Sequence, residues 1–216
     1  MSHRPMRIDP MARVAEPAAI LNRLGLTTPI LAKIGAIAIL TSSIEHRTEM
    51  TVRALNEYNA AGQRHCMNGC PSGIGDWIKA LAEVGSALQP GNLKMLMALW
   101  CQAAETALTC WNRIVHACIP SAGSEATSAL KLPRRQTEIR KRALLTSRVD
   151  EHCLALMEQV FAVLYRVLLT IEGAVRQRHM DIAENTVRTL LTALREACVT
   201  CREVEGTASE PHHEQF

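Results

Sequence analysis

The spacing of apolar residues constrains this fold more than any other sequence feature, because it repeats every three or four positions over long stretches. In residues 29–56 the repeating positions are Ile30, Ile34, Ile37, Thr41, Ile44, Thr48, Thr51 and Leu55. This is the period of one face of an α-helix, whereas a half-buried strand alternates every second residue. Residues 29–56 are therefore predicted to form a first long helix with one buried stripe.

Residues 76–88 form a second predicted helix, and Asp76 or Ser72 is its predicted N-cap because a side-chain oxygen can accept from free helical amides. Its shared apolar face consists of Trp77, Leu81, Val84 and Leu88. Asn92 begins a third predicted helix, which ends before Pro120 because proline cannot continue a helix. Its predicted buried stripe is Leu93, Met97, Trp100, Ala104, Leu108, Trp111, Val115 and Cys118.

Two more helices are predicted in the last third of the chain. One begins at the capping-box-like pair Ser147 and Asp150. Its apolar face is Val149, Cys153, Leu156, Val160, Val163, Leu164, Val167, Leu168 and Ile171. The last runs from about Asp181 to Val204. Its apolar positions are Ile182, Val187, Leu190, Leu191, Leu194 and Cys198.

Composition agrees with a helical fold. Aromatic residues make up only 3% of the 216 residues, and the apolar side chains are mainly of types that suit helix packing. The chain is predicted to be all-α, an antiparallel bundle of four to five long helices. Residues 1–28 are expected to form a mobile arm with a short helix after Pro17, residues 29–205 the bundle, and residues 206–216 a disordered tail.

Location and charge narrow the functional classes. The first residues carry charges and prolines where a signal peptide needs an unbroken apolar run, and Lys33 interrupts the longest apolar run, from Pro29 to Leu40. We therefore expect a cytoplasmic protein with no membrane partner. The formal charge is only +3, so any site for nucleic acid would have to be local.

Eight cysteines are present, and those within the predicted helices at Cys101, Cys110, Cys118 and Cys153 are expected to be buried, reduced thiols. The pairs Cys66 with Cys70 and Cys198 with Cys201 differ, since each has the spacing of half a tetrahedral zinc site. Unpaired thiols are the preferred interpretation, and neither a metal nor another cofactor is predicted.

A polar cluster stands near the end of the third predicted helix, in the segment CWNRIVHA. Glu105, Thr109, Asn112 and His116 fall in one narrow sector of the helix, with Arg113 to one side. Imidazole can transfer a proton near neutral pH, and guanidinium can hold a phosphate. His116 with Arg113 and Asn112 is therefore the candidate catalytic group, and the alternative is a solvated helix face or a polar contact to another helix.

The helix order, with LAKIGAIAILTSSIEHRTEM, DWIKALAEV, NRIVHA and LTSRVDEH in its successive segments, resembles the HEPN superfamily over roughly residues 29–176. The resemblance implies an all-α homodimer, and in many members a metal-independent ribonuclease of toxin or defence systems. The family motif is Arg, a polar residue that is often Asn, three variable residues, then His. Asn112 and His116 match its second and last positions, and Trp111 stands where the family has Arg.

Two classes of function follow. One is a non-catalytic or degenerate HEPN-like module that dimerises and binds a protein or RNA partner, which Trp111 favours. The other is a metal-independent endoribonuclease in which His116 moves the proton, Arg113 holds the phosphate and Asn112 orients the His. A basic run is the predicted RNA contact, with a solvated loop as its alternative. It comprises Arg134, Arg135, Arg140, Lys141 and Arg142.

Overall fold

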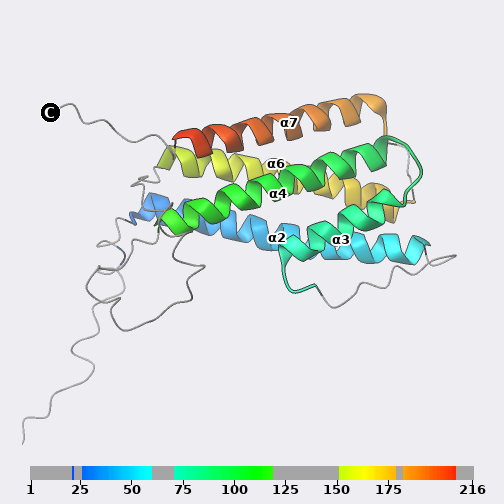
Figure 1. The fold of residues 1–216 in the computed structure, drawn as a ribbon, viewed down its shortest axis with the longest axis horizontal. Coiled ribbons are helices and arrows are strands. Elements are labelled where there is room, and N and C mark those ends of the chain that lie inside the picture. The colour runs from blue at the N-terminus through cyan, green and yellow to red at the C-terminus, as the bar shows by residue number, and fades with distance from the viewer. Residues whose placement is uncertain (1–20, 22–25, 60–70, 119–150, 179–181, 208–216) are drawn as a thin grey trace, which may run out of the picture.

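The computed structural model describes residues 21, 26–59, 71–118, 151–178 and 182–207. Within these ranges 89% of the residues are helical and none is in a strand, which confirms the predicted all-α bundle. The helices are α2 (Thr28–Asn59), α3 (Ile74–Ser86), α4 (Asn92–Cys118), α6 (Glu151–Arg176) and α7 (Glu184–Thr207) (Figure 1). The predicted N-terminal arm, the basic run and the C-terminal tail lie almost entirely outside the described residues.

The helices do not simply alternate in direction around the bundle. Helices that follow one another from α3 to α7 run antiparallel, as Figure 1 shows. In contrast, α2 and α6 run in the same direction, because Lys33 pairs with Glu158 and Arg47, further along α2, pairs with Glu172, further along α6. The seam between α2 and α6 is therefore a parallel one between distant parts of the sequence.

A second parallel seam joins α4 to α7. The side-chain amide of Asn92 at the start of α4 donates to the carbonyl of Ile182 just before α7, with Nδ2 and O 3.0 Å apart. Near the other ends of the two helices, Arg113 pairs with Glu205. The two contacts fix the register of α7 on α4 over most of their length.

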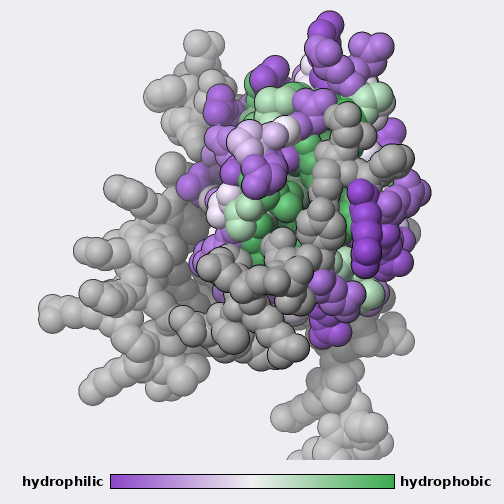
Figure 2. Space-filling model, turned by 90° about the vertical axis from the view of Figure 1, so that its right-hand side faces the viewer, coloured by the Kyte–Doolittle hydropathy of each residue, from purple (hydrophilic) through white to green (hydrophobic). Residues whose placement is uncertain are grey.

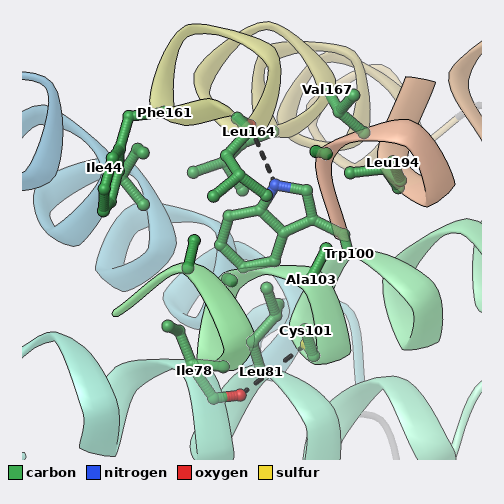
Figure 3. Close-up of a cluster of buried hydrophobic side chains, with 14 of the residues drawn as sticks. Ile44, Ile78, Leu81, Trp100, Cys101, Ala103, Phe161, Leu164, Val167 and Leu194 are labelled. Carbon is green, nitrogen blue, oxygen red and sulfur yellow. Dashed lines mark hydrogen bonds between the residues drawn. The ribbon is translucent and has the colours of Figure 1, made fainter. Parts of the chain in front are cut away.

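The indole of Trp100 occupies the middle of the core, where α4 faces α6 (Figure 3). Its Nε1 donates to the backbone carbonyl of Leu164, 2.8 Å away, so this fully buried polar atom is satisfied. The thiol of Cys101 on the opposite side donates to the carbonyl of Ile78 on α3. Seen from the end where α2 and α6 stop, hydrophilic side chains surround a hydrophobic centre (Figure 2).

The stripe predicted for α4 is fully buried in its first half and only half-buried in the described part of its second. Leu93, Met97, Trp100 and Ala104 are buried, but Leu108 and Trp111 are half-buried, whereas the row through Ala107, Cys110 and Ile114 is buried. Both rows are apolar, so spacing alone could not choose between them. The choice is made by tertiary packing, because Cys110 faces both α6 and α7 through Met157 and Cys201.

The predicted cap of α3 is also different. Gly73 occupies the N-cap position and makes no side-chain capping bond. Ser72 and Asp76 bond to each other instead, with the Ser72 hydroxyl 2.8 Å and its amide 3.1 Å from Oδ2 of Asp76. These hydrogen bonds from Ser72 lower the pKa of Asp76.

The helix α3 is less than half as long as α2 and lies beside the C-terminal half of α2, coloured cyan in Figure 1. The N-terminal half of α2 therefore has fewer neighbours. Two described segments, Thr28–Glu57 and Glu151–Arg176, are long and apolar enough to cross a membrane by length and composition alone. In the most apolar stretch of α6, 44% of the residues are buried in the bundle, but in that of α2 only 11% are.

Candidate functional site

The predicted polar sector lies on α4 and faces solvent. The side chains of Glu105, Thr109 and Asn112 are all exposed, and the Thr109 hydroxyl donates to the carbonyl of Glu105 within the helix. His116 has helical backbone, but its side chain lies outside what the structure describes. The described part of the sector is thus a solvated helix face, on which Asn112 is exposed.

Arg113 is joined to the neighbouring helix. Its Nη1 lies 2.7 Å from Oε1 of Glu205 on α7, and two thirds of the Arg113 side chain is exposed. A carboxylate at this distance neutralises the guanidinium charge and occupies one of its donor nitrogens. A phosphate would have to compete with Glu205 for this guanidinium.

Trp111 is held by packing. Its ring meets that of Phe161 on α6 edge to face, with the centroids 6.4 Å apart and the planes at 77°. Such aromatic pairs stabilise a helix contact beyond the area that they bury. The position at which the resembled family has its Arg is therefore used here to join α4 to α6.

Sequence reasoning missed a buried charge cluster on the seam between α2 and α6. Glu172 is 5% exposed, and its two oxygens lie 2.7 Å from Arg47 of α2 and 2.7 Å from Arg176 one turn later on α6. Nε of Arg47 also donates to the Tyr165 hydroxyl at 3.1 Å. The hydrogen bonds to Glu172 and Tyr165 raise the pKa of Arg47.

One signal for this cluster was present in the sequence. Glu172 lies one turn after Leu168 and next to Ile171, on the buried face of α6. A carboxylate on such a face needs a cation or several donors, since an unpaired buried charge is very costly. The sequence does not show which cation pairs with Glu172, because Arg47 is 125 residues away.

No disulfide joins the described cysteines. Cys101, Cys110 and Cys201 are buried, as expected for the first two, whereas Cys153, also expected to be buried, is half-buried. Cys201 does not face solvent with Cys198. The thiol of Cys110 lies 3.7 Å from the carbonyl of Cys201 and 3.6 Å from the Met157 sulfur. A hydrogen bond between the two thiols lowers the pKa of Cys110 and, together with burial, raises that of Cys201.

The four cysteines of the possible zinc site are not brought together in the described part of the chain. Cys66 and Cys70 lie outside it, and within it no three His, Cys, Asp or Glu side chains come together as metal ligands. The predicted RNA contacts from Arg134 to Arg142 also lie outside the described residues. Of the predicted site residues, only Asn112 and Arg113 therefore have described side chains, and both are exposed.

No protein-family model matches this chain, and neither a curated protein nor a solved structure matches it.

Proposed function

We propose that this chain is a non-catalytic HEPN-like helical module that acts by pairing with a second copy of itself and binding a partner. The observation that carries the proposal is the N-terminal half of α2, which α3 does not cover (Figure 1) and of whose most apolar stretch only 11% is buried. An apolar surface left in water is unfavourable, and such surfaces in helical proteins commonly mark interfaces.

The side of α2 that no described helix covers is made of small and apolar residues. Ile39 is 69% exposed, and nothing lies within 4 Å of where a Cβ on Gly35 would stand. The exposed residues of this surface are Ala32, Gly35, Ala38, Ile39 and Ser42, which we call the α2 face. Lys33 is the one charged residue of residues 28–44, and it pairs with Glu158 on α6. The α2 face is therefore uncharged and open to close approach.

A second copy of the chain suits this surface better than a charged partner. A twofold contact places a surface against itself, so a charged patch would meet like charge, whereas an uncharged one does not. Small side chains also let two helix backbones approach closely. The α2 face extends over about 16 Å of helix from Ala32 to Ser42, at about 1.5 Å per residue.

The arrangement around CWNRIVHA supports a non-catalytic role. Glu205 already neutralises Arg113 through one guanidinium nitrogen, so a phosphate would have to compete with it, and Trp111 is packed against Phe161. The alternative, an endoribonuclease using His116 with Arg113 and Asn112, requires a free guanidinium beside the imidazole. We therefore expect no cleavage of RNA by the wild-type chain.

Self-association is tested by analytical ultracentrifugation over a range of micromolar concentrations. The wild type is expected to be dimeric, and both Ile39→Glu and Gly35→Leu monomeric, because a charge or a bulky side chain would then stand in the contact. Val199→Glu is the matched control, since Val199 is an exposed apolar residue on α7, away from the α2 face. A monomeric wild type, or equal dissociation in Val199→Glu, would refute pairing through α2.

The enzymatic alternative is tested with a mixed RNA pool in EDTA. Wild type, His116→Ala, Arg113→Ala and Glu205→Ala are compared, and all four are expected to leave the RNA intact. The Glu205 variant removes the carboxylate that pairs with Arg113, so Arg113 could then bind a phosphate of the RNA. Cleavage by wild type that His116→Ala abolishes would show that the chain is a ribonuclease.

A further inference from the structure

Two arginines from different helices share one buried carboxylate at the seam between α2 and α6. Nη1 of Arg47 lies 2.7 Å from Oε2 of Glu172, and Nη2 of Arg176 lies 2.7 Å from Oε1 of the same residue. The two guanidinium groups are therefore held close to one another, each on one oxygen of a single carboxylate. We call Arg47 and Arg176 the arginine pair.

The arginine pair carries more positive charge than its partner neutralises. Glu172 supplies one negative charge against two positive charges, so the three residues have a net charge of +1. On α7, by contrast, the ion pair of Arg188 with Glu184 has equal charges and no such excess. Solvent reaches the arginine pair, because 35% of the Arg47 side chain and 54% of the Arg176 side chain are exposed.

Unused hydrogen-bond donors accompany this charge. Arg47 donates through Nε to the Tyr165 hydroxyl, 3.1 Å away, and through Nη1 to Glu172, which leaves Nη2 without an acceptor among the described residues. Arg176 donates to Glu172 through Nη2, so its Nε and Nη1 are unused in the same part of the chain. The half-buried Tyr165 hydroxyl accepts from Arg47, and no described residue accepts its own hydrogen.

We propose that the arginine pair and the Tyr165 hydroxyl bind the terminal phosphate of a phosphate monoester. The planar guanidinium group matches the geometry of phosphate oxygens, and its hydrogen bonds to an anion are stronger than those between neutral groups. Three donor groups are available, and a phosphate monoester has three terminal oxygens, whereas a carboxylate has two. A charge of about −1.5 to −2 on the phosphate at neutral pH offsets the excess of the pair.

Arg178 adds a positive charge at the end of α6. It is exposed and has a φ of 54°, in the left-handed region that glycine adopts most readily. Many helices end with glycine in this conformation. An arginine here is therefore less favourable for the fold than a glycine, but it places a third cation two residues after Arg176.

The alternative role of these arginines is purely structural. Cations near the carboxyl end of a helix interact favourably with the helix dipole, and Arg176 forms a helical pair with Glu172 four residues before it. A structural role predicts that replacing an arginine changes stability alone. A phosphate site predicts a loss of ligand affinity that is independent of any change in stability.

The experiment follows the arginine Nε–H signals of the full-length protein by NMR during titration with inorganic phosphate, with sodium chloride adjusted to constant ionic strength. Wild type is expected to bind with a dissociation constant of about 1 mM or lower. Arg176→Met should lower the affinity at least about tenfold and Tyr165→Phe about threefold, because a charged and a neutral donor are lost. Arg47 lies beyond the α2 face, so the test does not depend on self-association.

Two further variants separate binding from stability. Arg188→Met removes an exposed arginine from its pair with Glu184 four residues before it and should leave the phosphate affinity unchanged. Arg178→Gly should raise the melting temperature, because glycine suits the left-handed backbone, yet lower the affinity about twofold through the lost charge. Arginine signals that phosphate shifts no more than chloride does, or equal affinity losses in Arg188→Met and Arg176→Met, would overturn the proposal.

The monoester is tested with three phosphate compounds. Phosphoserine and adenosine 5′-monophosphate should both bind at least as tightly as inorganic phosphate, and the tighter of the two distinguishes a phosphoprotein from a nucleotide as the source. Dimethyl phosphate has two terminal oxygens and one charge, so it should bind at least about tenfold more weakly than inorganic phosphate. Dimethyl phosphate binding as tightly as both monoesters would refute recognition of a terminal phosphate.

Discussion

The carboxylate of Glu172 lies 2.7 Å from the guanidinium of Arg47, across the parallel seam between α6 and α2. Glu172 is almost fully buried, whereas about a third of the Arg47 side chain is exposed. The two residues therefore depend on each other unequally. Arg47 can turn to water if Glu172 is lost, but Glu172 cannot leave the bundle if Arg47 is lost.

Replacement of Arg47 by Met is expected to lower the free energy of unfolding by about 2–3 kcal/mol, less than for a fully enclosed pair because Arg176 still contacts the carboxylate. Arg176→Met should cost about 1 kcal/mol or less, since more than half of that side chain is exposed. Urea unfolding followed by circular dichroism measures both. Equal costs for the two variants would show that the arginines share the carboxylate evenly.

The double variant Arg47→Met with Glu172→Leu should recover most of the stability lost in Arg47→Met. Apolar side chains of similar volume can replace a buried ion pair with little loss of stability. Removal of one partner alone leaves the other as an unpaired buried charge. The comparison uses the same urea unfolding experiment. A double variant less stable than Arg47→Met would mean that Glu172 stabilises the seam through Arg176 alone.

Trp100→Phe is expected to lower the free energy of unfolding by about 2–3 kcal/mol, because it removes the bond to the Leu164 carbonyl and leaves a cavity in the middle of the core. Thermal and urea unfolding report the change. Trp111→Phe is the control, since Trp111 is half-buried and Phe can keep the edge contact with Phe161. We expect it to cost less than Trp100→Phe.

Helix positions in this chain follow closely from sequence. The predicted start of α4 at Asn92 is its observed start, and α4 ends at Cys118, two residues before Pro120. These limits are local, because a helix-breaking proline acts through its own ring and missing N–H. Spacing therefore indicated where helices lie without information about their neighbours.

The side of each helix that is buried, and the pairing of its charges, could be predicted only in part. In α4 both the row of Trp111 and the row of Cys110 are apolar, and contact with α6 and α7 buries the second more deeply. Likewise Arg113 and Glu205 each look like ordinary surface charges in sequence, and the register of α7 on α4 brings them together. These facts belong to tertiary packing.

The Cys101 thiol should make the protein less stable in alkaline solution. Burial raises its pKa to about 12 from an ordinary value of 9.0, so above pH 9 the unfolded chain loses this proton while the folded chain keeps it. Stability is then lost as pH rises, by at most about 1.4 kcal/mol per unit. Between about pH 9 and 11, wild type should lose about 2 kcal/mol more than Cys101→Ala. Parallel pH profiles of the two would disprove this.

Two glycines should respond differently to alanine. At Gly173 nothing lies within 4 Å of the new Cβ, so Gly173→Ala should raise the free energy of unfolding by about 0.5–1 kcal/mol through helix propensity. At Gly85 the Cβ would meet the Met97 methyl at 2.9 Å, so this side chain must turn and the net change should be near zero. Thermal unfolding compares them. Equal gains would show that Met97 moves freely.

The parallel seam between α2 and α6 also has a consequence for synthesis on the ribosome. Arg47 cannot bond to Tyr165 and Glu172 until they are synthesised, and they follow it by 118 and 125 residues. At about 5–20 residues per second, roughly 6–25 s separate their emergence. During that interval the apolar side of α2 has no α6 to cover it. The nascent chain therefore exposes an apolar helix face for most of its translation. A chaperone, or the α2 of a neighbouring nascent chain, would meet that helix before its own partner does.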